Sequence, residues 1–247
     1  MIYITGDTHG NFRRLFEGEY NELTGNDHLI ICGDFGGVWE RGTRQETILN
    51  YLSTLPFKIL FADGNHENFD LLNQYMRIVW GGGRVRYIRS NVYHLMRGEI
   101  YDIEGKNFFV MGGAASHDIQ NGVLDPKDPG FYDKKLRLRY EGKFFRVKGE
   151  SWWEDELPSE KEIDRAWNNL CECDKKVDYV ITHCAPTDIQ KKIAKKLHNN
   201  TYKPDRLTDF HQRVYDECEF VGWYCGHYHR NMQVKRINVL YEDLIEI

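Results

Sequence analysis

Short apolar runs alternate with amphipathic segments through the first third of the chain. Three apolar runs predict buried strands, at residues 2–5, 28–32 and 57–61. Apolar positions at helical spacing predict helices that follow these strands, at residues 11–17, 44–55 and 67–75. Strands and helices that alternate in this way are typical of a parallel sheet in an α/β fold.

The pattern changes near residue 77, where short strands follow one another without helices between them. Four apolar runs resemble a meander and predict a second, mostly antiparallel sheet, at residues 85–88, 92–95, 100–103 and 108–111. Later strands are expected to close that sheet, at residues 177–182, 220–225 and 232–247. Helices are expected at residues 159–170, 188–197 and 209–218, and Ser159 with Glu162 forms a capping box at the start of the first.

Residues 116–158 show no clear period. Asp-Pro turns interrupt this segment, which mixes seven aromatic residues with several basic ones. A loop of this length inside a compact domain is usually functional or flexible. We therefore expect one domain over residues 1–247, with an insert at about 116–158 that either serves the function or forms a solvated surface loop.

Composition limits the classes of function. The chain has 247 residues, of which 41% are apolar and 29% charged, with a formal net charge of -5 and no long run of one sign. Non-specific binding to nucleic acid is therefore not favoured. No run approaches the roughly 18–20 apolar residues of a membrane helix, and the first residues resemble a core strand rather than a signal peptide. The six cysteines form no disulfide framework, so we expect a cytoplasmic protein without membrane contact.

Five polar segments each follow directly on a predicted strand. They are Asp7-Thr8-His9, Gly33-Asp34, Gly64-Asn65-His66-Glu67, Thr182-His183 and Gly226-His227-Tyr228-His229. The carboxyl ends of parallel strands share one edge of a sheet, so the first three segments are expected to converge in space. Each segment alone is a weak signal, but five in this order indicate a common site.

The side chains in these segments suit a metal centre. Carboxylate, imidazole and amide donors together favour manganese, iron or zinc, and the absence of thiolates argues against a structural zinc site. Seven candidate ligands are too many for one ion and suit two ions that share a carboxylate: Asp7, His9, Asp34, Asn65, His183, His227 and His229. We expect two divalent ions, with Mn²⁺ first and iron or zinc as alternatives.

These motifs resemble the calcineurin-like metallophosphoesterase superfamily, and the resemblance extends from Asp7 to His229. It implies a four-layer α/β-β/α sandwich, in which two mixed sheets are flanked by helices and a dinuclear site lies between the sheets. The G-N-H-E motif, which includes Glu67, resembles the serine/threonine phosphatase branch in particular.

The resemblance also implies a role for each site residue. One metal would be held by Asp7, His9 and His229. The other would be held by Asn65, His183 and His227. Asp34 would bridge both, and His66 would act outside the ligand set as general acid or electrostatic stabiliser.

Two positions depart from the phosphatase branch. Gly37 stands where that branch has an aspartate that orients the catalytic histidine, and Asp63 stands where it has a phosphate-binding arginine. We expect Asp63 to take over the orienting role. We expect the phosphate-binding arginine to come from the insert, since guanidinium groups bind phosphate in bidentate fashion; the candidates are Arg137, Arg139 and Arg146.

The expected activity is hydrolysis of a phosphate ester by direct attack of a metal-bridging hydroxide, with His66 protonating the leaving oxygen. The first hypothesis is a phosphomonoesterase or protein phosphatase-like hydrolase, acting on a phosphorylated small molecule or a phosphoprotein. A phosphodiesterase or nuclease with the same centre is the alternative, although nucleic acid is not favoured as a partner. A non-catalytic metal-binding scaffold is a third hypothesis, and the oligomeric state stays open.

Overall fold

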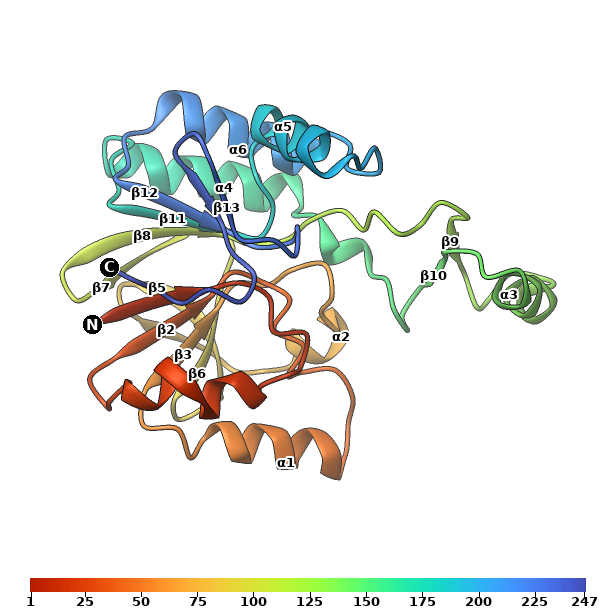
Figure 1. Ribbon diagram of the computed structural model, residues 1–247, viewed down its shortest axis with the longest axis horizontal. Helices are drawn as coiled ribbons and strands as arrows, with labels where there is room; N and C mark the ends of the chain where they lie inside the picture. Colours follow the sequence, from red (N-terminus) through yellow and green to blue (C-terminus); the bar gives the residue numbers. More distant parts are fainter.

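Two β-sheets pack face to face in the computed structural model, which describes residues 1–247, and helices cover both outer faces (Figure 1). The first sheet has seven strands in the order β15-β1-β2-β3-β6-β5-β4, and the second has six in the order β13-β14-β12-β11-β8-β7. Both sheets mix parallel and antiparallel pairs. This is the four-layer α/β-β/α sandwich that the family resemblance implies.

The strands of the first sheet are β1 (Ile2–Thr5), β2 (His28–Ile31), β3 (Lys58–Phe61), β4 (Arg77–Trp80), β5 (Gly83–Arg89), β6 (Val92–Leu95) and β15 (Ile245–Glu246). The strands of the second sheet are β7 (Glu99–Ile103), β8 (Lys106–Met111), β11 (Tyr179–Thr182), β12 (Gly222–Cys225), β13 (Met232–Val234) and β14 (Ile237–Val239). The helices of the sandwich are α1 (Thr43–Leu52), α2 (Phe69–Leu72), α4 (Glu160–Glu172), α5 (Thr187–Leu197) and α6 (Arg206–Glu217), with 3₁₀ turns η1 (Arg13–Phe16) and η2 (Gly18–Glu22). A third 3₁₀ turn, η3 (Glu154–Glu156), lies in the segment 116–158.

The sandwich has three hydrophobic cores, and strand β2 contributes to two of them. All four of its residues are buried, because it lies between β1 and β3 and is covered on both faces. Leu29 and Ile31 face the core that includes Leu49 of α1, whereas Ile30 faces the core between the two sheets. A third core lies between the second sheet and helices α4, α5 and α6. Because successive side chains of β2 point to opposite faces of the sheet, this strand contributes to the core on each side of the first sheet.

Several predicted boundaries are confirmed, among them the capping box of α4 at Ser159 and Glu162. The predicted meander is wrong: β5 and β6 belong to the first sheet, and β7 and β8 belong to the second. The second sheet is also not mostly antiparallel, because β8, β11, β12 and β14 pair in parallel, and β15 pairs with β1 in the first sheet. Alternation of apolar residues predicts a strand but does not specify which sheet it joins.

Residues 116–158 form an arm that extends away from the sandwich, with helix α3 (Phe131–Tyr140) at its far end (Figure 1). Two short strands, β9 (Val123–Leu124) and β10 (Arg146–Val147), pair in parallel, and a small core of four buried residues joins them to α3. The outer face of α3 leaves three apolar side chains exposed: Tyr132, Leu136 and Tyr140. The apolar residues of this helix do not form a single stripe, so the sequence pattern does not predict it.

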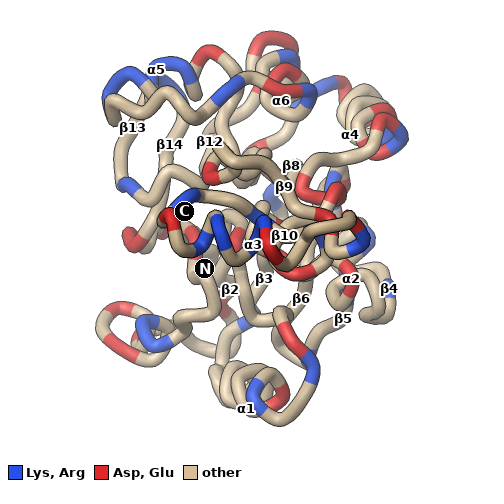
Figure 2. The backbone as a smooth tube through the Cα atoms, turned by 90° about the vertical axis from the view of Figure 1, so that its right-hand side faces the viewer, with Lys and Arg blue, Asp and Glu red and all other residues tan.

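Charged residues of both signs are mixed along the chain. Figure 2 shows lysine and arginine residues interspersed with aspartate and glutamate along most of the trace. None of the helices is both long and apolar enough to serve as a membrane span.

Candidate metal centre and active-site cleft

The loops that follow β1, β2, β3, β11 and β12 meet in one cluster, and backbone amides hold its two carboxylates in place. The His227 amide donates to the Asp7 carboxylate at 3.0 Å, and the His66 amide donates to Asp34 Oδ1 at 2.7 Å. His183 reaches Asp34 from the second sheet, with its Nε2 3.3 Å from Oδ1. The structure thus brings all five predicted segments together, although they come from two sheets.

The first donor set consists of Asp7, His9, Asp34 and His229. The Nε2 atoms of His9 and His229 lie 2.9 Å apart, so both imidazoles point at the same small space. Asp7 Oδ2 lies 3.2 Å from His229 Nε2 and 3.6 Å from His9 Nε2, and Asp34 Oδ2 lies 3.7 Å from His9 Nδ1. Two buried carboxylates and two converging imidazoles fit one divalent cation.

The second donor set consists of Asn65, His183 and His227, with Asp34 again at its edge. His183 Nε2 lies 3.2 Å from Asn65 Oδ1, and its Nδ1 donates to the carbonyl of Cys32 at 2.8 Å. This bond keeps the Nδ1 proton and leaves Nε2 available as a ligand. The His227 ring packs edge to face against His183, with centroids 5.0 Å apart. Because Asp34 turns Oδ2 to the first set and Oδ1 to the second, its position fits a bridging carboxylate.

Buried negative charge dominates the electrostatics of the cluster. Burial by itself would lower the pKa of His183, but the carboxylates of Asp34 and Asp7 outweigh it and raise the pKa to about 10. Burial lowers the pKa of His227, and the neighbouring charge of His183 lowers it further. Two buried carboxylates therefore require positive charge beside them, which a bound divalent cation would supply in place of protons.

Four site residues have backbone conformations that side chains rarely adopt. The φ angles are 46° at His9, 45° at Asp34, 71° at His227 and 48° at His229. Non-glycine residues in this left-handed region cost on the order of 1–3 kcal/mol each, and they concentrate at functional sites. Strain at four of the seven candidate ligands supports a cluster shaped for binding rather than for stability.

The glycines before the ligands have a second role besides turning the chain. A Cβ atom at Gly64 would collide with the Asp34 carboxylate, and one at Gly226 would collide with the Asp7 carboxylate. Glycine at these positions therefore lets neighbouring backbone approach the carboxylates closely.

Glu67 holds the loop that carries Asp34. It is fully buried, and its carboxylate accepts hydrogen bonds from the amides of Phe35 at 2.7 Å and Gly36 at 3.4 Å. The last residue of the G-N-H-E segment therefore supports the ligand loop and does not face the cleft.

Arg146 of β10 is the arm residue that reaches His66. Its Nη2 lies 3.3 Å from His66 Nε2, and its Nε donates to Asp118 Oδ1 at 3.0 Å. The other predicted arginines, Arg137 and Arg139, are exposed on α3 at the far end of the arm and make no side-chain contact with the cleft (Figure 1). Among the three predicted phosphate-binding arginines, only Arg146 lies beside His66.

Asp63 has a different partner from the one that the sequence predicts. Its Oδ1 accepts from His94 Nε2 at 3.0 Å, and its Oδ2 accepts from Arg97 Nε at 2.7 Å, so both oxygens are engaged away from His66. Gly37, at the position of the orienting aspartate in the phosphatase branch, has no space for a side chain, because a Cβ atom there would collide with the Phe35 ring. Asp63 is therefore part of a buried ion-pair network and does not orient His66.

Two residues that the sequence analysis missed connect the arm to a candidate ligand. Asn65 Nδ2 donates to Ser116 Oγ at 3.3 Å, and Glu156 accepts from both Ser116 Oγ at 2.9 Å and the Ser116 amide at 3.1 Å. Burial raises the pKa of Glu156 to about 8, against the effect of these hydrogen bonds. The two ends of the arm thereby fix the Asn65 amide with its oxygen toward His183.

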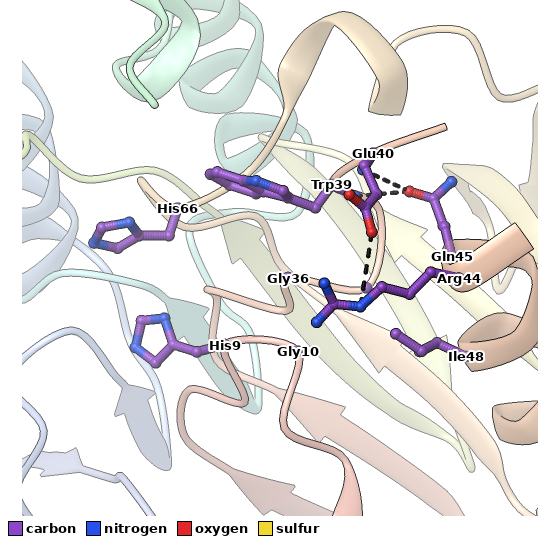
Figure 3. A pocket seen from close by; sticks show the side chains of 10 residues that line it. His9, Gly10, Gly36, Trp39, Glu40, Arg44, Gln45, Ile48 and His66 are labelled. Carbon is purple, nitrogen blue, oxygen red and sulfur yellow. Dashed lines mark hydrogen bonds and ion pairs between the residues drawn. The ribbon is translucent and has the colours of Figure 1, made fainter. Parts of the chain in front are cut away.

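Cavities flank the cluster on both sides. One of about 320 Å³ begins at His9 and His66 and extends along Trp39 to Arg44, which forms an ion pair with Glu40 (Figure 3). The other, of about 440 Å³, begins at His227. The donor cluster therefore lies beside two cavities.

A comparison with known protein families agrees with this architecture. The calcineurin-like phosphoesterase family matches residues 1–231, a range that includes all seven candidate ligands and His66. A comparison with curated proteins gives no match. The match covers nearly the whole chain, and the sandwich and the converging Asp/His cluster agree with it. The chain therefore belongs to the calcineurin-like phosphoesterase family and has the fold and donor cluster of a metal-dependent phosphoester hydrolase.

Proposed function

We propose that this protein is a phosphomonoesterase with a dinuclear metal centre. The observation that carries the proposal is the pair of donor sets that share Asp34, whose two oxygens face His9 and His183 respectively. Asp7, His9 and His229 would hold one ion, Asn65, His183 and His227 would hold the other, and Asp34 would contact both. Two such ions would lower the pKa of water and neutralise charge on the phosphoryl oxygens.

His66 is proposed to deliver a proton to the leaving oxygen. Burial lowers the pKa of His66, and the nearby Arg146 lowers it further, so the free imidazole is neutral and its Nε2 accepts from the guanidinium. A phosphate dianion would attract Arg146 away from His66 and release that nitrogen. The negative charge of the substrate would then raise the pKa of His66, which favours the protonated form needed for general acid catalysis.

The position of Arg146 favours a phosphomonoester over a phosphodiester as the substrate. Its side chain lies beside His66 and is held by the Asp118 carboxylate, and the base of the same arm holds Asn65 through Ser116. A planar guanidinium binds two phosphate oxygens at once, and a monoester offers one more charged oxygen than a diester. A phosphodiesterase is the second candidate, because the two cavities beside the cluster could each hold one substituent of a diester.

Matched aryl substrates test the proposal. The protein is purified, stripped of metal, reloaded with Mn²⁺, Fe²⁺ or Zn²⁺, and assayed on p-nitrophenyl phosphate and bis(p-nitrophenyl) phosphate. We expect activity that requires the metal and a higher kcat/KM on the monoester. A higher kcat/KM on the diester would favour the second candidate, and inactivity on both substrates with two metals bound would contradict the proposed function.

A further inference from the structure

The helix at the far end of the arm has apolar side chains on two opposite faces. Phe131 and Leu138 face the small core that α3 shares with β9 and β10. Tyr132, Leu136 and Tyr140 stand four residues apart, so they form one stripe along the other face, and they are 80%, 70% and 93% exposed. The arm extends away from the sandwich, and the rest of the chain leaves this stripe uncovered (Figure 1). An apolar stripe along a helix usually packs against a neighbour.

The stripe is large for a surface that stays in water. A tyrosine covers about 150–250 Å² when it is buried, so the two tyrosines and the leucine together offer on the order of 400–600 Å². Apolar patches of this size on soluble proteins are often binding sites. The size of the stripe therefore indicates a partner that covers it.

The charge around the stripe is opposite to that of the rest of the molecule. Residues 131–148 contain seven lysine and arginine residues and two acidic residues, which gives this arm tip a net charge of +5. The whole chain has a net charge of -5, so the remaining residues together carry -10. Arg137 and Arg139 are exposed on α3, one on each side of the stripe, and Figure 2 shows basic positions along this helix. The tip therefore fits a surface that is both apolar and acidic.

The sandwich has a cavity of this kind beside η1, η2 and β15. It occupies about 640 Å³, and its lining combines three buried or half-buried apolar side chains with four exposed carboxylates: Tyr20, Leu244, Ile245, Glu17, Glu19, Glu242 and Asp243. The segments that supply them, residues 17–27 and 240–247, contain seven acidic residues and no lysine or arginine. The one basic residue in the lining, Arg14, donates to backbone carbonyls of the same chain at 2.9–3.0 Å, so these carboxylates do not engage it.

We propose that the stripe on α3 and this acidic cavity form an interface between two copies of the chain, in which each copy places its arm tip against the cavity of the other. Charge selects this arrangement. Two tips repel each other, and so do two sandwiches, whereas a tip of +5 is attracted to a sandwich of -10. The contact is also reciprocal in a two-fold pair, so the assembly closes as a dimer.

The area agrees with a stable dimer. A two-fold pair forms the contact twice, and each contact covers the stripe and an equal area of the cavity, which gives about 1,600–2,400 Å² in all. Stable protein interfaces cover roughly 1,200–2,000 Å². An arm-to-arm contact would cover only about half as much and would bring two like charges together.

Sedimentation velocity on the full chain tests this proposal without any substrate, so its outcome is independent of the proposed phosphoesterase activity. We expect a dimer at about 50 µM protein, since interfaces of this size have a Kd in the micromolar range or below. Leu136→Glu, at an exposed position that the fold does not need, should raise the dimer Kd by about 100-fold or more, because the stripe is buried at both contacts. Lys161→Glu, an exposed charge reversal on α4, is the matched control and should leave the Kd within about twofold.

A charge exchange tests which surface receives the arm. Arg139→Glu and Glu242→Arg should each raise the dimer Kd by about tenfold or more, because each places like charges at both contacts. The double variant restores opposite charges and should bind more tightly than either single variant. A monomer at low salt, a dimer that Leu136→Glu leaves intact, or a double variant no tighter than the single ones would each overturn the proposal. A monomer that binds vesicles of phosphatidylcholine and phosphatidylglycerol through Leu136 would also overturn it, because the stripe would then belong to a lipid surface.

Discussion

Replacing Asp63 by alanine would destabilise the fold with little effect on catalysis. The carboxylate is 1% exposed and accepts from His94 at 3.0 Å and from Arg97 at 2.7 Å. Arg97 is itself buried and also donates to the carbonyl of Asp155 at 2.6 Å, which favours its present position when its partner is removed. The variant would therefore leave a buried cation without its counterion.

The magnitude follows from that uncompensated charge. Breaking a buried ion pair by removing one partner costs about 3–5 kcal/mol. For a chain of this size, each kcal/mol lowers Tm by about 2–4 °C, so we expect a fall of roughly 6–20 °C. The double variant Asp63→Asn with Arg97→Gln removes both charges and should recover part of this loss. Glu172→Ala, at an exposed carboxylate of α4, is the control and should leave Tm within about 1–2 °C.

Thermal unfolding and steady-state kinetics on the same samples test whether Asp63 has a structural or a catalytic role. Measured well below Tm, kcat per folded molecule should stay within a few fold of wild type, because neither oxygen of Asp63 contacts His66. The opposite result, an unchanged Tm with a kcat reduced by about 10²-fold or more, is what an orienting partner of a general acid would give. That result would refute the structural role and restore the prediction made from the sequence.

Four further perturbations address the cluster and the buried histidines. Asp34→Asn should lose both metals by elemental analysis, and two tightly bound metals in an active variant would exclude the bridging role. His66→Gln should keep both metals and lose about 10²–10⁴-fold in kcat, with a smaller loss on good leaving groups such as p-nitrophenol; equal losses on good and poor leaving groups would leave only charge stabilisation. Arg146→Ala should raise KM for monoesters more than for diesters at constant metal content, while Arg139→Ala on α3 should change neither, and equal effects of the two variants would exclude a phosphate-binding role. Burial lowers the pKa of His211 to about 3, below its ordinary value of about 6.5 in the unfolded chain. The free energy of unfolding should therefore decrease as the pH is lowered from about 6.5 to about 3, by up to about 1.4 kcal/mol per pH unit. Denaturant titrations of His211→Gln should show a shallower dependence on pH.

The convergence of Asp7, Asp34 and Asn65 could be predicted from the chain alone. Each follows a short apolar strand, and parallel neighbouring strands must end at the same edge of a sheet, so β1, β2 and β3 deliver their loops to one place. The types of side chain then indicated metal, because carboxylates and imidazoles gathered without thiolates suit divalent cations. The family resemblance extended this argument to His183 and His227, which the second sheet contributes.

The partners of Asp63 and Arg146 could not be predicted in this way. Asp63 immediately precedes the G-N-H-E segment, yet its carboxylate points to His94 on β6 and to Arg97, because β6 pairs with β3 in the first sheet. Arg146 stands among several basic residues of similar type, and only the path of the arm places it, rather than Arg137 or Arg139, beside His66. A residue's neighbours in sequence do not specify which long-range contacts its side chain makes.

The sequence by itself determined the alternation of strands and helices, the segments that carry the metal donors, and the kind of chemistry that those donors support. These features are local, since they depend on the period of apolar positions and on which residues follow each strand. Only the tertiary structure decided the assignment of β5 to β8 to two sheets, the contact of the arm with Asn65 through Ser116 and Glu156, and the acidic cavity that residues 17–20 and 242–245 form together. The physical reason is that these features arise from packing between segments far apart in the chain, where shape and hydrogen-bond geometry select one arrangement among several that the same local pattern allows.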